Sequence, residues 1–404
     1  MSSGNPLRHR DFALLLAGRL VSQTGTQMMH VALLWHVYRL SDGNPLALGA
    51  IGLARAVPLI VTALFGGVLA DAYDRRRLLI GTQIGFFAIS SALAAVTIEG
   101  DATLWILYAA TALGGVAIAL DNPARQAIVA NVVPEAELSR AMSQSSTAFN
   151  VARIAGPAAG GLALAAWDVG VVYAIDAATF LVMLGCMVAL RYRPEQRPAV
   201  RPGLAAMIEG FAYLRRQPVV WSTMLLDFFA TFFADALLLL PIFANEIFHR
   251  GAAGLGWLTS AHGMGAVAAG LTLSFMRLPK RQGAVVIVAI FFYGLAYAAF
   301  GFSRNFWLSM ALLAAAGAAD TVSAVVRMTL RQLLTPDALR GRMNSINMIF
   351  FAGGPQLGEM EAGALASFVG ARWAVRIGGF ACLLTSAAFG LYRPLRSYRS
   401  EDRP

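Results

Sequence analysis

Apolar residues along this chain fall into long segments separated by short polar stretches. Each segment is about 20 residues long, which is the length of a helix that crosses the bilayer core. Segments such as Ile175–Leu190 and Ala284–Phe302 show no alternation of polar and apolar positions, whereas a transmembrane β-barrel alternates them over strands of about 10 residues. The pattern therefore predicts a polytopic all-α membrane protein.

We expect twelve transmembrane helices, and an even number places both termini on one side of the membrane. Arginines concentrate in the loops on that side, so the positive-inside rule predicts that both termini are cytoplasmic. The predicted spans are Phe12–Val37, Ala47–Leu69, Leu78–Ile98, Leu104–Leu120, Met142–Ala166, Val169–Leu190, Val219–Phe243, Leu255–Met276, Ala284–Phe302, Phe306–Val326, Met343–Phe368 and Ala374–Leu391.

The longest polar break predicts a division into two six-helix halves, residues 1–190 and 219–404, joined by a cytoplasmic linker, residues 191–218. Part of the linker places its apolar residues on one helical face, which predicts an amphipathic helix on the membrane surface; a simple connecting turn is the alternative. The residues on this face are Leu204, Met207, Ile208, Phe211 and Leu214.

Sequence elements recur in the two halves in the same order. The stretch from Asp121 to Met142 is echoed from Asp320 to Met343, and Gly156-Pro157 is echoed by a second Gly-Pro pair in the other half. Parallel repeats with a site at their interface are typical of secondary transporters.

Composition also argues against a soluble protein. Charged residues make up 13% and hydrophobic residues 58%, against about 25% charged residues in soluble domains. The net charge is +10. We attribute it to arginines in cytoplasmic loops, as the positive-inside rule predicts, and therefore expect no nucleic-acid partner.

Cys186 and Cys382 lie inside apolar segments, so neither a disulfide nor a metal site is expected. Common hydrolase, dithiol and nucleotide-binding motifs are absent, so we expect no enzyme and no cofactor.

The loop between the second and third spans carries a glycine pair, an acid and three arginines, from Gly66 to Arg77. An acid and arginines in a short loop can pair with each other and with helix ends. This stretch resembles the loop signature of the major facilitator superfamily, although Asp74 stands where that signature has glycine. The resemblance assigns Gly67, Asp71, Arg75 and Arg76 to a gating loop.

The fifth span contains Gly156, Pro157, Gly160 and Gly161, small residues that allow close helix packing. This stretch is similar to the antiporter signature of facilitator-type exporters. The match is partial, because Thr147 replaces the first glycine of that signature. An arginine midway along the fourth span, also associated with antiporters, is absent.

Three further segments, Asp121–Gln126, Arg340–Asn344 and Leu357–Gly363, resemble the bacterial branch of this superfamily that includes the enterobactin exporter and putative multidrug exporters. The resemblance extends over essentially the whole chain. It implies a twelve-helix facilitator fold in the bacterial cytoplasmic membrane, and export of a small molecule.

Charged residues inside a span are costly and therefore candidate functional residues. Near the cytoplasmic ends of spans four and ten, the acid and the arginine of each span share a helical face, and we interpret all four as a gate latch rather than as substrate contacts. These residues are Asp121, Arg125, Asp320 and Arg327.

The proton-coupling candidates are Asp227, Asp235, Glu359 and Glu361. A desolvated carboxylate can bind and release a proton, which is the chemistry of a proton-coupled exporter, and a tie between helices is the alternative. Arg19 and Asp227 lie at similar depth, so they form either a charge pair across the cavity or separate contacts within their own halves.

A polar face on the first span and two further arginines predict a substrate cavity. Its candidate residues are Arg19, Gln23, Gln27, Arg55 and Arg153. Since acids and arginines both occur within the spans, the sequence leaves open a siderophore-like metabolite and a lipophilic drug as cargo.

We therefore expect a monomeric secondary exporter of an amphipathic small molecule, driven by proton antiport and surrounded by membrane lipids. A lipid-flipping or sensor protein built on the same fold is the alternative.

Overall fold

The computed structural model describes residues 5–72, 75–191, 211, 213–215, 217–235, 237–276, 279–336 and 340–398. Within these ranges the chain is helical and contains no β-strand. The helices of the first sequence half are η1 (Pro6–Arg8), α1 (Arg10–Leu40), α2 (Pro45–Ala72), α3 (Arg75–Glu99), α4 (Leu104–Val132), α5 (Glu135–Ala166) and α6 (Val169–Ala189). Those of the second half are α8 (Pro218–Ala234), η2 (Leu237–Leu239), α9 (Leu240–Ile242), η3 (Phe243–Ile247), α10 (Gly251–Phe275), α11 (Gln282–Phe302), α12 (Phe306–Leu334), α13 (Arg340–Val369), α14 (Ala371–Leu391) and α15 (Arg393–Arg396).

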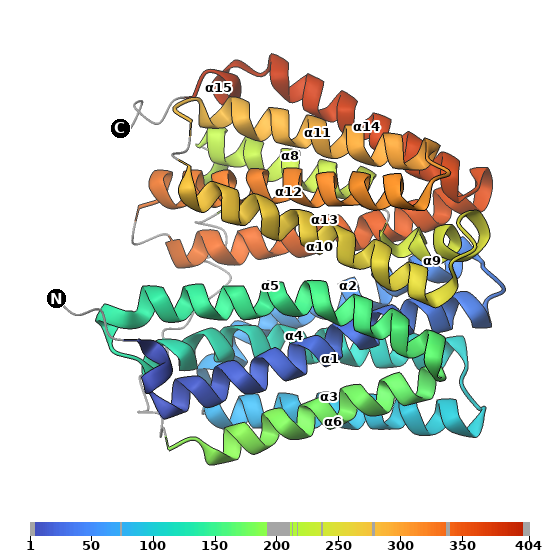
Figure 1. Ribbon diagram of the computed structural model, residues 1–404. Coiled ribbons are helices and arrows are strands. Elements are labelled where there is room, and N and C mark those ends of the chain that lie inside the picture. Colours follow the sequence, from blue (N-terminus) through green and yellow to red (C-terminus); the bar gives the residue numbers. More distant parts are fainter. Residues whose placement is uncertain are drawn as a thin grey trace. The chain divides into compact units, whose positions relative to one another are not determined.

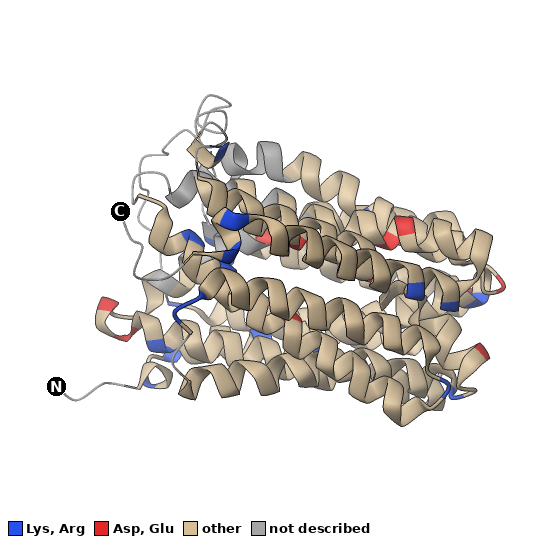
Figure 2. Cartoon of the chain, turned by 90° about the horizontal axis from the view of Figure 1, so that it is seen from above, with Lys and Arg blue, Asp and Glu red and all other residues tan. Residues whose placement is uncertain are grey.

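Eight helical stretches of the described part are long and apolar enough to cross a membrane, which agrees with the prediction of a multi-pass membrane protein. The count of twelve spans and the cytoplasmic termini stay predictions. Figure 2 shows many of the charged residues at helix ends and in loops, with a smaller number inside the helices. These internal charges are the ones that need partners.

The described chain forms two compact units. The first comprises the described residues of Met1–Asp42, Ala54–Arg201 and Arg250–Ser260. In this unit α1 packs against α5 and α6, and α3 packs against α4 and α6 (Figure 1). Its core includes Leu15, Leu79 and Met187, which come from three different helices.

The second unit comprises the described residues of Gly43–Leu53, Pro202–His249 and Ala261–Pro404. Here α11 packs against α12 and α14, and α8 packs against α13 and α14 (Figure 1). Each unit thus contains one short segment from the other sequence half: the start of α2 belongs to the second unit and the start of α10 to the first. The predicted domain boundary in the linker stays a prediction.

Most of the predicted linker helix lies outside the described residues, including Leu204, Met207 and Ile208. The described residues at its end are helical, and Leu214 is fully buried against Val220 and Met224. This end of the linker therefore packs into protein.

Two helices extend beyond the spans predicted within them, although the candidate membrane span of α4, Leu104–Asp121, agrees with the prediction. Span four was expected to end at Leu120 and span ten at Val326, but α4 continues to Val132 and α12 to Leu334. The length of an apolar segment reflects the thickness of the bilayer core. A helix can continue beyond that core, because its backbone hydrogen bonds form within the helix itself. As a result Asp121, Arg125 and Arg327 all lie inside regular helices.

The seventh predicted span, Val219–Phe243, lies within one candidate membrane span, Pro218–Ile247, but this span is not one continuous helix. Helix α8 ends at Ala234 and Asp235 is its C-cap residue. The chain then continues through the 3-10 helix η2 and the short helix α9 into the π-helical turn η3. Asp235 therefore lies at a break in the helix.

Candidate functional site

Asp121 is the centre of a buried polar cluster in the first unit. Its Oδ1 accepts hydrogen bonds from Thr82 Oγ1 at 3.0 Å and Gln83 Nε2 at 2.8 Å, both on α3. Its Oδ2 accepts the Nε of Arg125, one turn along α4, at 2.8 Å, together with an Nη2 contact. A carboxylate has about four acceptor positions, so these bonds satisfy Asp121 and tie α3 to α4.

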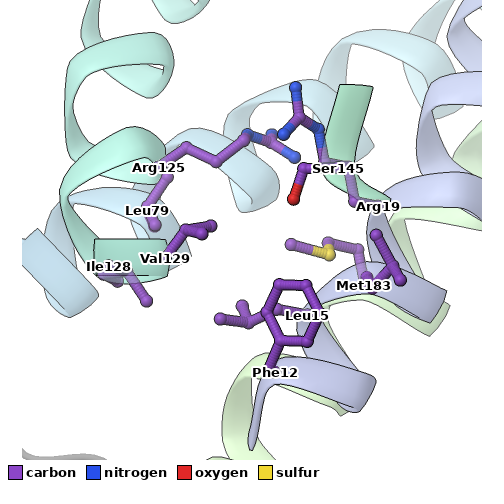
Figure 3. Close-up of a pocket in the computed structure, with 10 residues that line it drawn as sticks. Phe12, Leu15, Arg19, Leu79, Arg125, Ile128, Val129, Ser145 and Met183 are labelled. Carbon is purple, nitrogen blue, oxygen red and sulfur yellow. The ribbon is translucent and has the colours of Figure 1, made fainter. Parts of the chain in front are cut away.

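Arg19 and Arg125 line a narrow cavity beside this cluster (Figure 3). Both guanidinium groups and Ser145 lie on one side of the view, while Phe12 and Leu15 form the opposite, apolar side. The cavity has a volume of about 10 Å³, which is the room of one water molecule. It brings together one predicted cavity residue and one predicted latch residue.

Arg327 is the centre of the corresponding cluster in the second unit. It forms an ion pair with Asp227 of α8 and lies 4.0 Å from Asp320 of its own helix. Asp227 and Arg327 are both buried, whereas 36% of the Asp320 side chain is exposed. The predicted contact between Asp320 and Arg327 on one face is present, and Asp227 is satisfied within its own unit.

Asp235 acts as a cap at the break after α8, where its Oδ1 accepts the backbone N–H of Leu237 at 3.4 Å. The buried residues Tyr293 and Tyr297 of α11 pack with ring centroids 5.0 Å apart. Both hydroxyls lie within electrostatic range of Asp235 and Asp320. These tyrosines therefore lie near two of the acids.

Glu359 of α13 is buried against the start of α2 in the second unit, and Glu361 is half-buried. A Cβ built on Gly52 would lie 2.6 Å from the Cβ of Glu359 and 2.9 Å from its Oε2. Gly52 therefore provides the space that the glutamate side chain fills.

The remaining cavity candidates of the first unit have local contacts. Arg55 Nη2 donates to His30 Nδ1 at 3.1 Å, which joins α2 to α1. Arg153 lies 6.0 Å from the ring centroid of Phe149 on its own helix. Gln27 lies on the face of α1 that contacts Gly156 of α5, and Gln23 is half-buried on the same helix.

The glycines of the antiporter-like stretch are buried and contact two helices. A Cβ on Gly160 would lie 2.9 Å from the Cα of Met28 on α1, and one on Gly161 would lie 2.7 Å from the Cα of Gly256 on α10. The carbonyl of Pro157 also lies against Gly256. Small residues therefore let three backbones meet, as expected for close packing inside a membrane.

The whole chain, residues 1–404, matches the family described as "Transmembrane secretion effector", MFS_3. The chain belongs to this family of the major facilitator superfamily. The enterobactin exporters EntS of Shigella boydii serotype 4 and of Escherichia coli O1:K1 are each 26% identical to it, with 93% of this chain and 90% of theirs aligned. The chain is therefore similar to transporters over nearly its full length.

Solved transporter structures share the fold of this major facilitator protein. A POT family transporter in complex with 5-aminolevulinic acid gives a TM-score of 0.79 at 11% identity, covering 95% of this chain and 96% of that chain. A bacterial homologue of the human lysosomal transporter Spinster gives 0.76 at 14% identity, covering 99% of both chains. At these identities the likeness extends to the fold alone.

Three residues of the predicted gating loop lie where the structure does not describe the side chains: Gly67, Asp71 and Arg75. Arg76 is described: its Nη2 donates to the carbonyls of Met187 and Val188 at the end of α6, both at 3.1 Å. The first turn of α3 is therefore hydrogen-bonded, through Arg76, to the carbonyl end of α6.

The sequence interpretation missed Asp176 of α6. It is 1% exposed, and Ser90 Oγ of α3 donates to its Oδ2 at 2.6 Å. Its Oδ1 has no hydrogen-bond partner in the described part of the chain, and it faces Gly25 of α1. An acid in the middle of an apolar span is the signal that finds such a residue.

Proposed function

We propose that this protein is a secondary active exporter. It moves an amphipathic small molecule out of the cytoplasm across the bacterial cytoplasmic membrane, by proton antiport and alternating access. The observation that carries the proposal is the nearly full-length similarity to enterobactin exporters. The buried acids of the second unit support the proton-coupled mechanism.

In this mechanism Arg327 exchanges its carboxylate partner. In the structure it pairs with Asp227, while Asp320 lies within reach at 4.0 Å. An ionised carboxylate without a partner is costly inside a membrane, so Asp227 takes up a proton when Arg327 leaves it. Arg327 then pairs with Asp320, and α8 is released from α12. Proton binding is thereby coupled to helix movement.

Asp235, Glu359 and Glu361 are further proton-coupling candidates. Asp235 lies at a helix break, where the backbone can rearrange with little loss of hydrogen bonds, and Glu359 lies at the contact of α13 with α2. We expect Asp235→Asn or Glu359→Gln to abolish proton-coupled export while leaving the protein folded. Full export by both variants would remove these two residues as proton carriers.

Efflux from energised cells that lack their own exporters tests the proposal. One set of cells is loaded with an iron-free catecholate siderophore and another with a fluorescent lipophilic cation, each with and without a protonophore. Export of either compound that the protonophore abolishes supports the proposal. Export of neither contradicts it and favours lipid flipping or sensing.

A further inference from the structure

The charge balance around Arg19 differs from that of Arg125 and Arg327, each of which pairs with a carboxylate. Asp121 is the carboxylate that acts electrostatically on Arg19, and Arg125 is a second cation nearby. All acceptor positions of Asp121 are used by Thr82, Gln83 and Arg125. Asp121 therefore neutralises Arg125, and the charge of Arg19 is left uncompensated.

Hydrogen bonding leads to the same conclusion. The Nε of Arg19 is buried without an acceptor among the described residues, and no carboxylate there forms an ion pair with its guanidinium. An unpaired charge inside a membrane protein normally faces a partner or a ligand. A guanidinium is a planar donor that matches carboxylates and other oxyanions.

The surroundings of Arg19 match one class of ligand. The two guanidinium groups and the hydroxyl of Ser145 lie beside an apolar wall that includes Phe12 and Leu15 (Figure 3). The volume of about 10 Å³ is the room of one water molecule, so the cavity admits a single oxygen atom of an anionic group and leaves the rest of the cargo outside it.

We propose that Arg19, Arg125 and Ser145 form the subsite that binds the anionic group of the cargo, a carboxylate or an ionised phenol. The cargo is then an amphipathic anion and not a lipophilic cation. This inference rests on the proposed export function and names its substrate class. Asp227 is consistent with it, because its charge is already compensated by Arg327.

Equilibrium binding to the purified protein in detergent tests the subsite. The probes are salicylate, its neutral amide salicylamide, and the cation tetraphenylphosphonium. We expect salicylate to bind more tightly than salicylamide, and Arg19→Gln to weaken salicylate binding about tenfold or more while leaving salicylamide unchanged. Arg19→Lys keeps the charge and should retain part of the affinity. Arg39→Gln is the matched control, since Arg39 is an exposed residue at the other end of α1.

Equal affinity for salicylate and salicylamide, or unchanged salicylate binding by folded Arg19→Gln, would overturn the subsite. Transport assays separate the two proposals. Proton-driven export of tetraphenylphosphonium without salicylate binding would overturn the subsite and leave the exporter proposal standing. Arg19-dependent salicylate binding without export of any compound would overturn the exporter proposal alone.

Discussion

Arg327 of α12 forms an ion pair with Asp227 of α8, and both side chains are largely buried. Removing one member of a buried pair leaves an uncompensated charge, at a cost of about 3–5 kcal/mol. Asp320 at 4.0 Å can replace part of the lost interaction in Asp227→Asn, so we expect a loss toward the lower end of that range. Thermal unfolding in detergent micelles measures it.

The double variant Asp227→Asn with Arg327→Gln provides the control for this pair. It should be less destabilised than the sum of the two single variants, because neither charge remains alone. Additive effects would contradict a direct interaction between the two side chains.

The glycine contact between α5 and α10 should not tolerate a larger residue. A Cβ on Gly161 would lie 2.7 Å from both the carbonyl of Ala252 and the Cα of Gly256. Since backbone atoms cannot easily give way, Gly161→Ala should cost about 1–3 kcal/mol and lower the rate of transport. Unfolding temperature and export rate are the two measurements. Gly114→Ala in α4 is the matched control, because a Cβ there meets no atom within 4 Å, and wild-type behaviour of both variants would contradict the close contact.

Asp176 should tolerate an amide better than alanine. In Asp176→Asn the side-chain oxygen still accepts the hydrogen bond of Ser90, which in the structure measures 2.6 Å. In Asp176→Ala this buried hydroxyl loses its partner, and the cost is about 1–3 kcal/mol. We expect a near-normal unfolding temperature for the first variant and a lower one for the second. The opposite order would contradict the hydrogen bond to Ser90 as the main contribution of this side chain to stability.

Neutralising Asp121 should increase the affinity for anions if the folded structure is kept. Asp121→Asn leaves Arg125 without its carboxylate partner, so two uncompensated guanidinium groups then face the cavity. We expect salicylate to bind more tightly, and binding to weaken more steeply with added salt, than in the unmodified protein. Titration at low and high ionic strength measures both effects, and weaker binding at both would count against an electrostatic subsite.

The fold class and the helix positions could be predicted from the sequence because each apolar segment reflects the membrane thickness. Helix ends were less predictable, since α4 and α12 continue beyond their apolar segments with polar residues. The signal for the break after Asp235 is Pro241, which lies inside the predicted span and begins the next short helix, but four apolar leucines separate it from the break.

Pairing within one helix was predictable, and pairing between helices was not. Spacing placed Arg125 one turn from Asp121 and put Arg327 on the face of Asp320, and both contacts are present. The contact of Arg327 with Asp227 depends on how α12 packs on α8, and the spacing of residues along the chain does not determine that packing. Asp176 was overlooked although the rule for buried charges applies to it.

Transport in inside-out membrane vesicles shows whether proton antiport drives export by this protein. Respiration acidifies the interior of such vesicles, and an exporter carries its cargo into them. We predict that a catecholate siderophore accumulates inside, that its addition releases protons from the interior as reported by a pH-sensitive dye, and that a protonophore abolishes both signals. Accumulation that survives the protonophore, with no change in interior pH, would contradict proton antiport.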